Sequence, residues 1–194
     1  NLHNFINING QDILIEILKN KTQVIFISGH FSNFELMAQH IEKSNIKLAA
    51  IYRPLNNFFL NNTMEEIRKK FICKKQIKKG LSGTREVLKN INDGYSIALM
   101  IDQRVSEGIK VDFFNRKALT TTIPAQLIKK YKLNVVPVHI ERQNKHYFNL
   151  CFKKPIIFDP SDDVEKITFT LNECLEKMIL KNPSQWIWSH NRWK

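Results

Sequence analysis

Short apolar runs alternate with amphipathic segments along the chain. The runs at 23–28 (QVIFIS), 46–52 (IKLAAIY) and 95–101 (YSIALMI) are almost entirely apolar and contain β-branched residues. Such runs are typical of strands that are buried on both faces of a sheet. Apolar residues at helical spacing predict helices at 11–19, 33–43, 62–71, 83–92, 122–131 and 163–181.

Two further runs, 134–141 and 147–155, flank the polar turn RQNKH and predict an antiparallel strand pair near the C-terminal end. Strands that alternate with helices form a mostly parallel sheet with helices packed on its faces. The sequence therefore predicts an α/β fold in a single domain over residues 1–194. We expect a mostly parallel central sheet flanked by helices on both faces, with a C-terminal antiparallel strand pair.

Three polar side chains directly follow predicted strands: His30, Arg53 and Asp102. Ligands of parallel sheets gather at the carboxyl ends of the strands. We therefore expect these three side chains to lie at a common site.

Glu35 has two interpretations. With Ser32 it fits a capping box, in which the serine caps a helix and the glutamate three residues later bonds back to the cap. Alternatively, the loop folds back and brings the Glu35 carboxylate to the His30 ring. A carboxylate there would fix the tautomer and leave the other ring nitrogen free to take a proton from a hydroxyl.

Composition and charge add information about partners. The 194 residues are 43% hydrophobic, which suits a folded domain, and 30 basic against 18 acidic residues give a net charge of +12. Such a charge favours anionic partners, although a general richness in Lys, Asn and Ile would also produce it. Six lysines fall within 69–79, either as a solvated surface or as a dock for an anion. The apolar residues inside the polar stretch 54–62 fit a core plug, an acyl groove or a bilayer contact.

Several classes of protein are disfavoured. The three cysteines show no CxxC spacing, so no zinc site is expected. No apolar run approaches the roughly 20 residues of a membrane-spanning helix. A nucleic-acid-binding domain is suggested by charge alone, and no helix-turn-helix, zinc or RRM pattern supports it. We therefore expect no nucleic-acid partner.

Six blocks, in order, carry a resemblance to a known family. GHFSNFE (29–35) resembles the HX4E motif of the lipid A biosynthesis acyltransferases, within the lysophospholipid acyltransferase superfamily. Further matching blocks are YRP (52–54), the segment EEIRKKF with Arg68, the stretch 83–103 ending in Asp102 and Gln103, the stretch 111–130, and NPSQWIWSHNRWK (182–194). The likeness covers about residues 8–194.

The resemblance implies transfer of an acyl group from an acyl thioester to a hydroxyl of a lipid A precursor. It implies that His30 is the general base and that Glu35 assists it. We expect substrate binding by Arg53, Arg68, Asp102 and Gln103, with no metal and no cofactor. Glu35 and the ending WSHNRWK favour lipid A, while a lysophospholipid or another glycolipid stays open as the acceptor.

The resemblance also implies partners and a location. The expected partners are acyl carrier protein, with acyl-CoA as the other possible donor, a glycolipid acceptor and an anionic membrane surface. The expected location is the cytoplasmic face of an inner membrane. Members of the family normally begin with a membrane-anchoring segment, and we expect such a segment to be missing ahead of Asn1.

Overall fold

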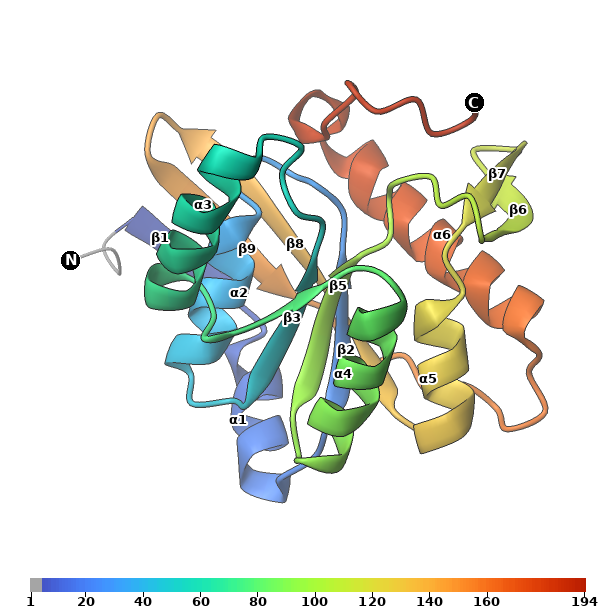
Figure 1. The fold of residues 1–194 in the computed structure, drawn as a ribbon, viewed down its shortest axis with the longest axis horizontal. Coiled ribbons are helices and arrows are strands. Elements are labelled where there is room, and N and C mark those ends of the chain that lie inside the picture. Colours follow the sequence, from blue (N-terminus) through green and yellow to red (C-terminus); the bar gives the residue numbers. More distant parts are fainter. Residues whose placement is uncertain (1–4) are drawn as a thin grey trace.

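The computed structural model describes residues 5–194, except for the side chains of Phe58 and Leu81 (Figure 1). A central sheet has the strand order β1-β9-β8-β2-β5-β3-β4. Its strands are β1 (Ile6–Asn9), β2 (Val24–Ser28), β3 (Leu48–Tyr52), β4 (Lys75–Lys78), β5 (Ser96–Met100), β8 (Asn134–Asn144) and β9 (Tyr147–Phe152). The helices are α1 (Gln11–Asn20), α2 (Glu35–Lys43), α3 (Phe58–Phe71), α4 (Leu81–Asn92), α5 (Ile123–Tyr131) and α6 (Val164–Lys181).

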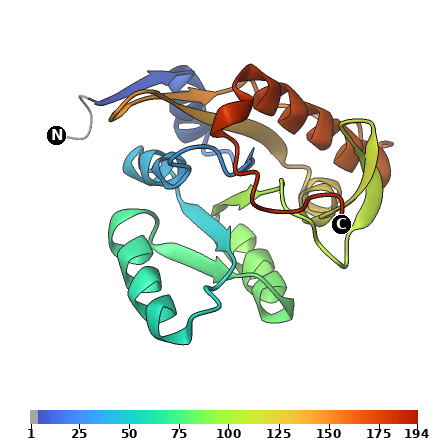
Figure 2. The ribbon, with the colours of Figure 1, turned by 90° about the horizontal axis from the view of Figure 1, so that it is seen from above.

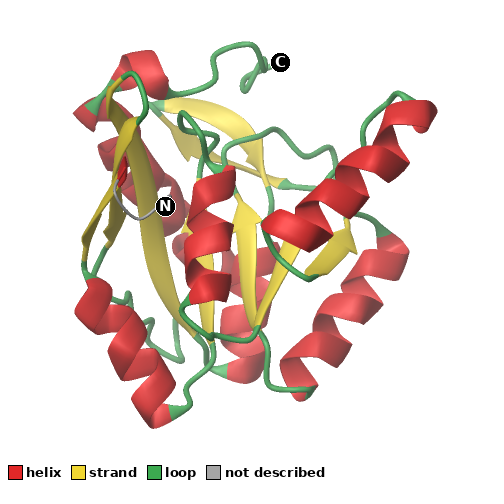
Figure 3. Cartoon of the chain, turned by 90° about the vertical axis from the view of Figure 1, so that its left-hand side faces the viewer, coloured by secondary structure: helices red, strands yellow, loops and turns green. Residues whose placement is uncertain are grey.

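The predicted fold class is confirmed. Neighbouring strands of the sheet pair in parallel, except β8 and β9, which form the predicted antiparallel pair. Helices α1, α2 and α3 lie on one face, and α4, α5 and α6 lie on the other (Figures 1 and 2). Figure 3 shows the strands between the two groups of helices. Because β2 is central, all five of its residues are buried, which explains why four of the five are apolar.

Four strands were not predicted from the sequence. β1 and β4 have only four residues each and lie at the two edges of the sheet. β4 was hidden within the lysine-rich stretch that we expected to be a solvated surface or an anion dock. The other two, β6 (Ile109–Phe113) and β7 (Arg116–Thr120), form a separate antiparallel hairpin. Its turn residues Phe114 and Asn115 both have positive φ, as a tight hairpin turn requires.

Helix α3 begins four residues earlier than predicted. The side chain of Asn57 accepts hydrogen bonds from the backbone N–H groups of Phe59 and Leu60, at 3.0 and 3.3 Å. An asparagine in this role stabilises a helix start. The apolar residues expected within a polar loop therefore belong to the first turn of α3. Among residues 5–194, none of the helices has the length and hydropathy to span a bilayer.

Candidate active site

The sheet brings His30 and Asp102 together. β2 and β5 are hydrogen-bonded neighbours, and Ser28 at the end of β2 pairs with Met100 at the end of β5. His30 and Asp102 each stand two residues beyond this pair. The Nδ1 atom of His30 lies 2.8 Å from Oδ1 of Asp102, and the backbone N–H of His30 donates to Oδ2 at 2.8 Å. The parallel register thus fixes the distance between these two side chains.

Asp102 is a buried carboxylate with three N–H partners. Its side chain is only 3% exposed, and Oδ2 also accepts a hydrogen bond from Nε1 of Trp186 at 2.9 Å. Burial raises the pKa of Asp102, but the hydrogen bonds and charge of His30 and the bond from Trp186 outweigh it, so the pKa is lowered. The ionised carboxylate holds the ring proton on Nδ1 of His30. Nε2 is then left as the proton acceptor.

The C-terminal segment delivers Trp186 to this site. A short 3₁₀ turn, Pro183–Gln185, precedes it. The N–H of Ser32 donates to the carbonyl of Gln185 at 2.8 Å, and the N–H of Ile187 donates to the carbonyl of His30 at 3.0 Å. These bonds pair the segment with the loop that follows β2. Trp186 is therefore buried between them and reaches Asp102.

The prediction that Glu35 contacts the His30 ring is wrong. Glu35 instead accepts a hydrogen bond from Nε of Arg68 on α3, at 2.7 Å. The reason is the path of the loop: its pairing with the C-terminal segment holds His30 against Asp102. Glu35 stands at the start of α2 and faces α3. Asp102, expected to bind substrate, is the residue that holds the histidine.

The capping-box interpretation of Glu35 is also wrong. Ser32 has a left-handed backbone, with φ of 41°, and the residue before the helix is Phe34, which makes no side-chain cap. The role of Glu35 in this structure is to hold the Arg68 guanidinium in place. A charge-assisted bond of this kind is strong when it is partly shielded from water.

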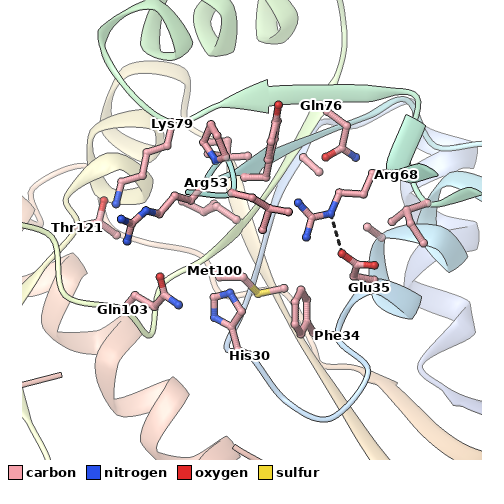
Figure 4. Close-up of a pocket in the computed structure, with 18 of the residues that line it drawn as sticks. His30, Phe34, Glu35, Arg53, Arg68, Gln76, Lys79, Met100, Gln103 and Thr121 are labelled. Atoms are coloured by element: carbon pink, nitrogen blue, oxygen red, sulfur yellow. Dashed lines mark hydrogen bonds and ion pairs between the residues drawn. The ribbon is translucent and has the colours of Figure 1, made fainter. Parts of the chain in front are cut away.

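A pocket of about 410 Å³ opens above His30 at the carboxyl ends of the strands. Of the six expected site residues, five line it: His30, Glu35, Arg53, Arg68 and Gln103; Asp102 lies behind His30. Figure 4 shows Arg53 and Lys79 on one side of the pocket and Arg68 with Glu35 on the other. The remaining wall is largely apolar and includes Phe34, Ala38, Ala50, Ile51, Leu55, Ile72, Leu99, Met100, Val105 and Ile123.

The pocket is electropositive. Three of its lining residues are Arg53, Arg68 and Lys79, and Glu35 is the one carboxylate among the described lining residues. Burial, assisted by the charge of Arg53, lowers the pKa of Lys79. A site of this charge favours a ligand that carries a phosphate or a carboxylate. Among residues 5–194, no three His, Cys, Asp or Glu side chains are grouped as metal ligands.

Sequence reasoning missed three residues of the site: Lys79, Trp186 and His190. Lys79 was interpreted only as part of the lysine run, and Trp186 was noted only within the matching block at its end of the chain. His190 lines the pocket, and its Nε2 accepts the backbone N–H of Arg104 at 2.9 Å. Burial lowers the pKa of His190, which favours a neutral ring. Only the matching block at 182–194 pointed to this segment.

A buried arginine holds the same segment in place. Arg192 is fully buried and donates to the carbonyl of Leu119 and to the hydroxyl of Thr120, at 2.7 and 2.6 Å. Its guanidinium lies 5.0 Å from the centre of the Phe113 ring. Burial lowers the pKa of Arg192 to about 10, so the group stays charged at neutral pH. The segment that carries Trp186 is thereby attached to β7.

The site thus combines a histidine held by a buried carboxylate with a cationic pocket at the strand ends of an α/β sheet, an arrangement in which a histidine can take a proton from a bound hydroxyl. Over residues 1–194 the chain matches the family model of bacterial lipid A biosynthesis acyltransferase. It is 23% identical over 183 residues to lipid A biosynthesis acyltransferase 2 of Shigella flexneri. That alignment covers 92% of this chain and 58% of the relative's length. The chain belongs to the bacterial lipid A biosynthesis acyltransferase family, which confirms the resemblance.

Proposed function

We propose that the chain transfers a fatty acyl group from an acyl thioester to a hydroxyl of a lipid A precursor, with His30 as the general base. Family membership supports the reaction class. The observation that carries the mechanism is the 2.8 Å contact between Nδ1 of His30 and the buried Asp102 carboxylate. It replaces the expected assistance by Glu35.

The proposed reaction is a direct transfer from the thioester to the hydroxyl and needs no covalent enzyme intermediate. Nε2 of His30 takes the proton of the acceptor hydroxyl as the oxygen attacks the thioester carbonyl carbon. The carbonyl oxygen carries the negative charge of the tetrahedral intermediate. The C–S bond then breaks, the ester carbonyl re-forms, and the imidazolium returns its proton to the leaving thiolate. The Asp102 carboxylate stabilises the imidazolium between these two steps.

The cations of the pocket bind and orient the acceptor. Arg53 and Lys79 on one side offer charged donors to an anionic group such as a phosphate. Arg68 on the other side is held in a fixed direction by Glu35. Gln103 also lines the pocket, next in sequence to Asp102, and supplies amide donors near the reacting carbonyl. In this proposal Arg53, Arg68 and Gln103 bind substrate, as expected from the sequence.

An apolar pocket of about 190 Å³ adjoins the main one and suits a hydrocarbon chain. It lies between β3, β4, α4 and α5 and shares Ile51, Lys79 and Ile123 with the main pocket. Its wall includes Ile77, Val87, Leu88 and Leu127. Burying a chain there removes apolar area from water and positions the thioester. We infer that the donor's acyl chain enters this pocket.

The proposal also includes the acyl donor and the cellular location of the reaction. Acyl carrier protein is the donor that the family suggests, with acyl-CoA as the alternative, and neither requires a metal or a cofactor. The net charge of +12 suits both an acidic carrier and an anionic membrane at the cytoplasmic face of the inner membrane.

Mass spectrometry of lipid products tests the proposal. The chain and its His30→Ala variant are incubated with acyl carrier protein thioesters or acyl-CoA and a mixture of lipid A precursors, lysophospholipids and other glycolipids. We expect a lipid A precursor to gain one acyl group, and His30→Ala to abolish the gain. His146→Ala, at an exposed histidine distant from the pocket, is the matched control. Transfer by His30→Ala at the wild-type rate would refute the role of His30 as general base. Transfer only to another lipid would refute the assignment of a lipid A precursor as the acceptor.

A further inference from the structure

Helix α3 presents an apolar stripe to solvent. Leu60, Met64, Ile67 and Phe71 are spaced by four, three and four residues, so at 100° per residue they fall within a sector of about 60°. Leu60 is 56% exposed, Ile67 is 42% exposed and Phe71 is 54% exposed, while Met64 is half-buried. We call these four residues the α3 stripe. Figure 2 shows α3 at the periphery of the molecule.

A neighbouring face of α3, about 100° around the helix from the stripe, is polar and already has its partners. Asn61 is buried and donates to Glu65 at 2.6 Å, and Glu65 also pairs with Lys78 at 3.0 Å. Arg68 is bound to Glu35. α3 therefore packs against the rest of the chain through polar side chains, whereas a helix on a water-facing surface packs through its apolar stripe. The exposed stripe thus needs a partner outside the described residues.

Lysines border the α3 stripe. Lys70 is exposed in the last turn of α3, and Lys74 is exposed just beyond the helix. Nζ of Lys70 lies 5.2 Å from the centre of the Phe71 ring. An apolar strip with a basic border is the pattern of helices that lie in the interface of an anionic bilayer. Each lysine near such a surface adds attraction to acidic head groups.

We propose that the α3 stripe inserts into the interface of an anionic lipid bilayer and that Lys70 and Lys74 contact its head groups. A second copy of the chain is a poorer occupant, because a symmetric contact would bring the two lysine borders together. An acidic protein would use the lysines but leave the apolar stripe largely unexplained.

The functional purpose of this membrane docking rests on the proposed function, because docking would bring the pocket close to a lipid acceptor. Arg68 projects from the neighbouring polar face of α3 into the pocket. A helix with its side chains is about 10 Å wide, so the pocket would lie within that distance of the bilayer surface. A lipid acceptor could then enter the site while its acyl chains stay in the membrane.

Sedimentation with sucrose-loaded vesicles tests the docking without any turnover. The vesicles contain phosphatidylcholine alone or phosphatidylcholine with phosphatidylglycerol. We compare the wild type with Ile67→Gln/Phe71→Gln. The matched control is Phe169→Gln/Leu180→Gln on α6, where the two side chains are 37% and 63% exposed. All four positions are on the surface, so each variant should fold.

We expect the wild type to bind the anionic vesicles, and Ile67→Gln/Phe71→Gln to lower the partition coefficient about tenfold or more. The α6 control should bind like the wild type. Lys70→Gln/Lys74→Gln should lose about fivefold for each charge on anionic vesicles. Equal loss in the α6 control, or no loss in the α3 variant, would overturn the proposal. So would an absence of vesicle binding together with stripe-dependent binding of acyl carrier protein.

An activity measurement separates the docking from the proposed function. The α3 variant should acylate acceptor dispersed in detergent at the wild-type rate and acylate vesicle-embedded acceptor about tenfold more slowly. Full activity of the variant on vesicle-embedded acceptor would overturn the docking. If the wild type acylates nothing while its vesicle binding still depends on the stripe, the proposed function fails and the docking stands.

Discussion

Replacing Asp102 by asparagine should remove most of the activity through the tautomer of His30. Oδ2 of Asp102 accepts two N–H groups, from the His30 backbone and from Trp186, and Oδ1 faces Nδ1 of the ring. Asparagine has one oxygen, and the two fixed donors hold it at the Oδ2 position. Its NH₂ group then faces Nδ1, which must accept the hydrogen bond. The ring proton moves to Nε2, and the general base is lost.

The size of the effect follows from comparable chemistry. In a Ser-His-Asp triad the same replacement lowers kcat by about 10⁴ because the tautomer is wrong. The Asp102 site has the same contact and similar burial, so we expect a loss of about 10³–10⁴ in kcat. This corresponds to roughly 4–5.5 kcal/mol of transition-state stabilisation. The replacement is nearly isosteric, and the free energy of unfolding should fall by no more than about 3 kcal/mol.

The assay is the initial rate of acyl transfer over a range of acceptor concentrations, with urea unfolding of each variant alongside. Glu35→Gln is the matched control, because it makes the same change at the carboxylate that holds Arg68. Glu35→Gln should raise KM for the acceptor and change kcat little. The reasoning is refuted if Asp102→Asn keeps kcat within tenfold of the wild type. It is also refuted if Glu35→Gln lowers kcat as far as Asp102→Asn does.

Three further predictions concern binding and stability. Arg68→Lys loses the Nε contact with Glu35, so KM for the acceptor should rise about tenfold while kcat stays within a few-fold; equal kinetics to wild type would contradict this. Burial lowers the pKa of His139 to about 4, so the folded state binds fewer protons than the unfolded state below pH 6.5. The free energy of unfolding should therefore fall by about 2 kcal/mol as the pH is lowered from 7 to 5. Urea unfolding at the two pH values should show that the free energy of unfolding of His139→Leu falls by about 2 kcal/mol less than that of the wild type. A Cβ at Gly83 in α4 would lie 1.8 Å from the carbonyl oxygen of Lys78, so Gly83→Ala should cost at least about 2 kcal/mol; an unchanged urea midpoint would show that α4 can shift away from β4.

The buried strands could be predicted because strands covered on both faces consist mainly of apolar residues. β2, β5 and the first half of β8 are largely apolar because the sheet is covered on both faces. The edge strands β1 and β4 could not be predicted, because four residues with at most one buried position resemble a loop. The hairpin β6–β7 lies outside the central sheet and has no such apolar run.

The candidate site could be predicted in part. The rule that ligands gather at strand ends selected His30, Arg53 and Asp102. The pairing of His30 with Asp102 could not be derived, because strand order is a property of the folded sheet. β5 inserts between β2 and β3, so Asp102, two residues after β5, reaches His30, and Glu35, the first residue of α2, does not. The contact of Trp186 with Asp102, 84 residues apart, carries no local signal.

The register of β2 with β5 places the His30–Asp102 pair and the wall of the pocket under different structural constraints. Backbone hydrogen bonds in the middle of the sheet set the spacing of His30 and Asp102. The pocket's wall also draws on α3, through Arg68, and on the loops after β3 and β5. Residues in these outer segments can be exchanged, inserted or deleted without changing the strand register. In the proposed mechanism, changes in these segments would therefore alter the preference for an acceptor while His30 and Asp102 keep their spacing.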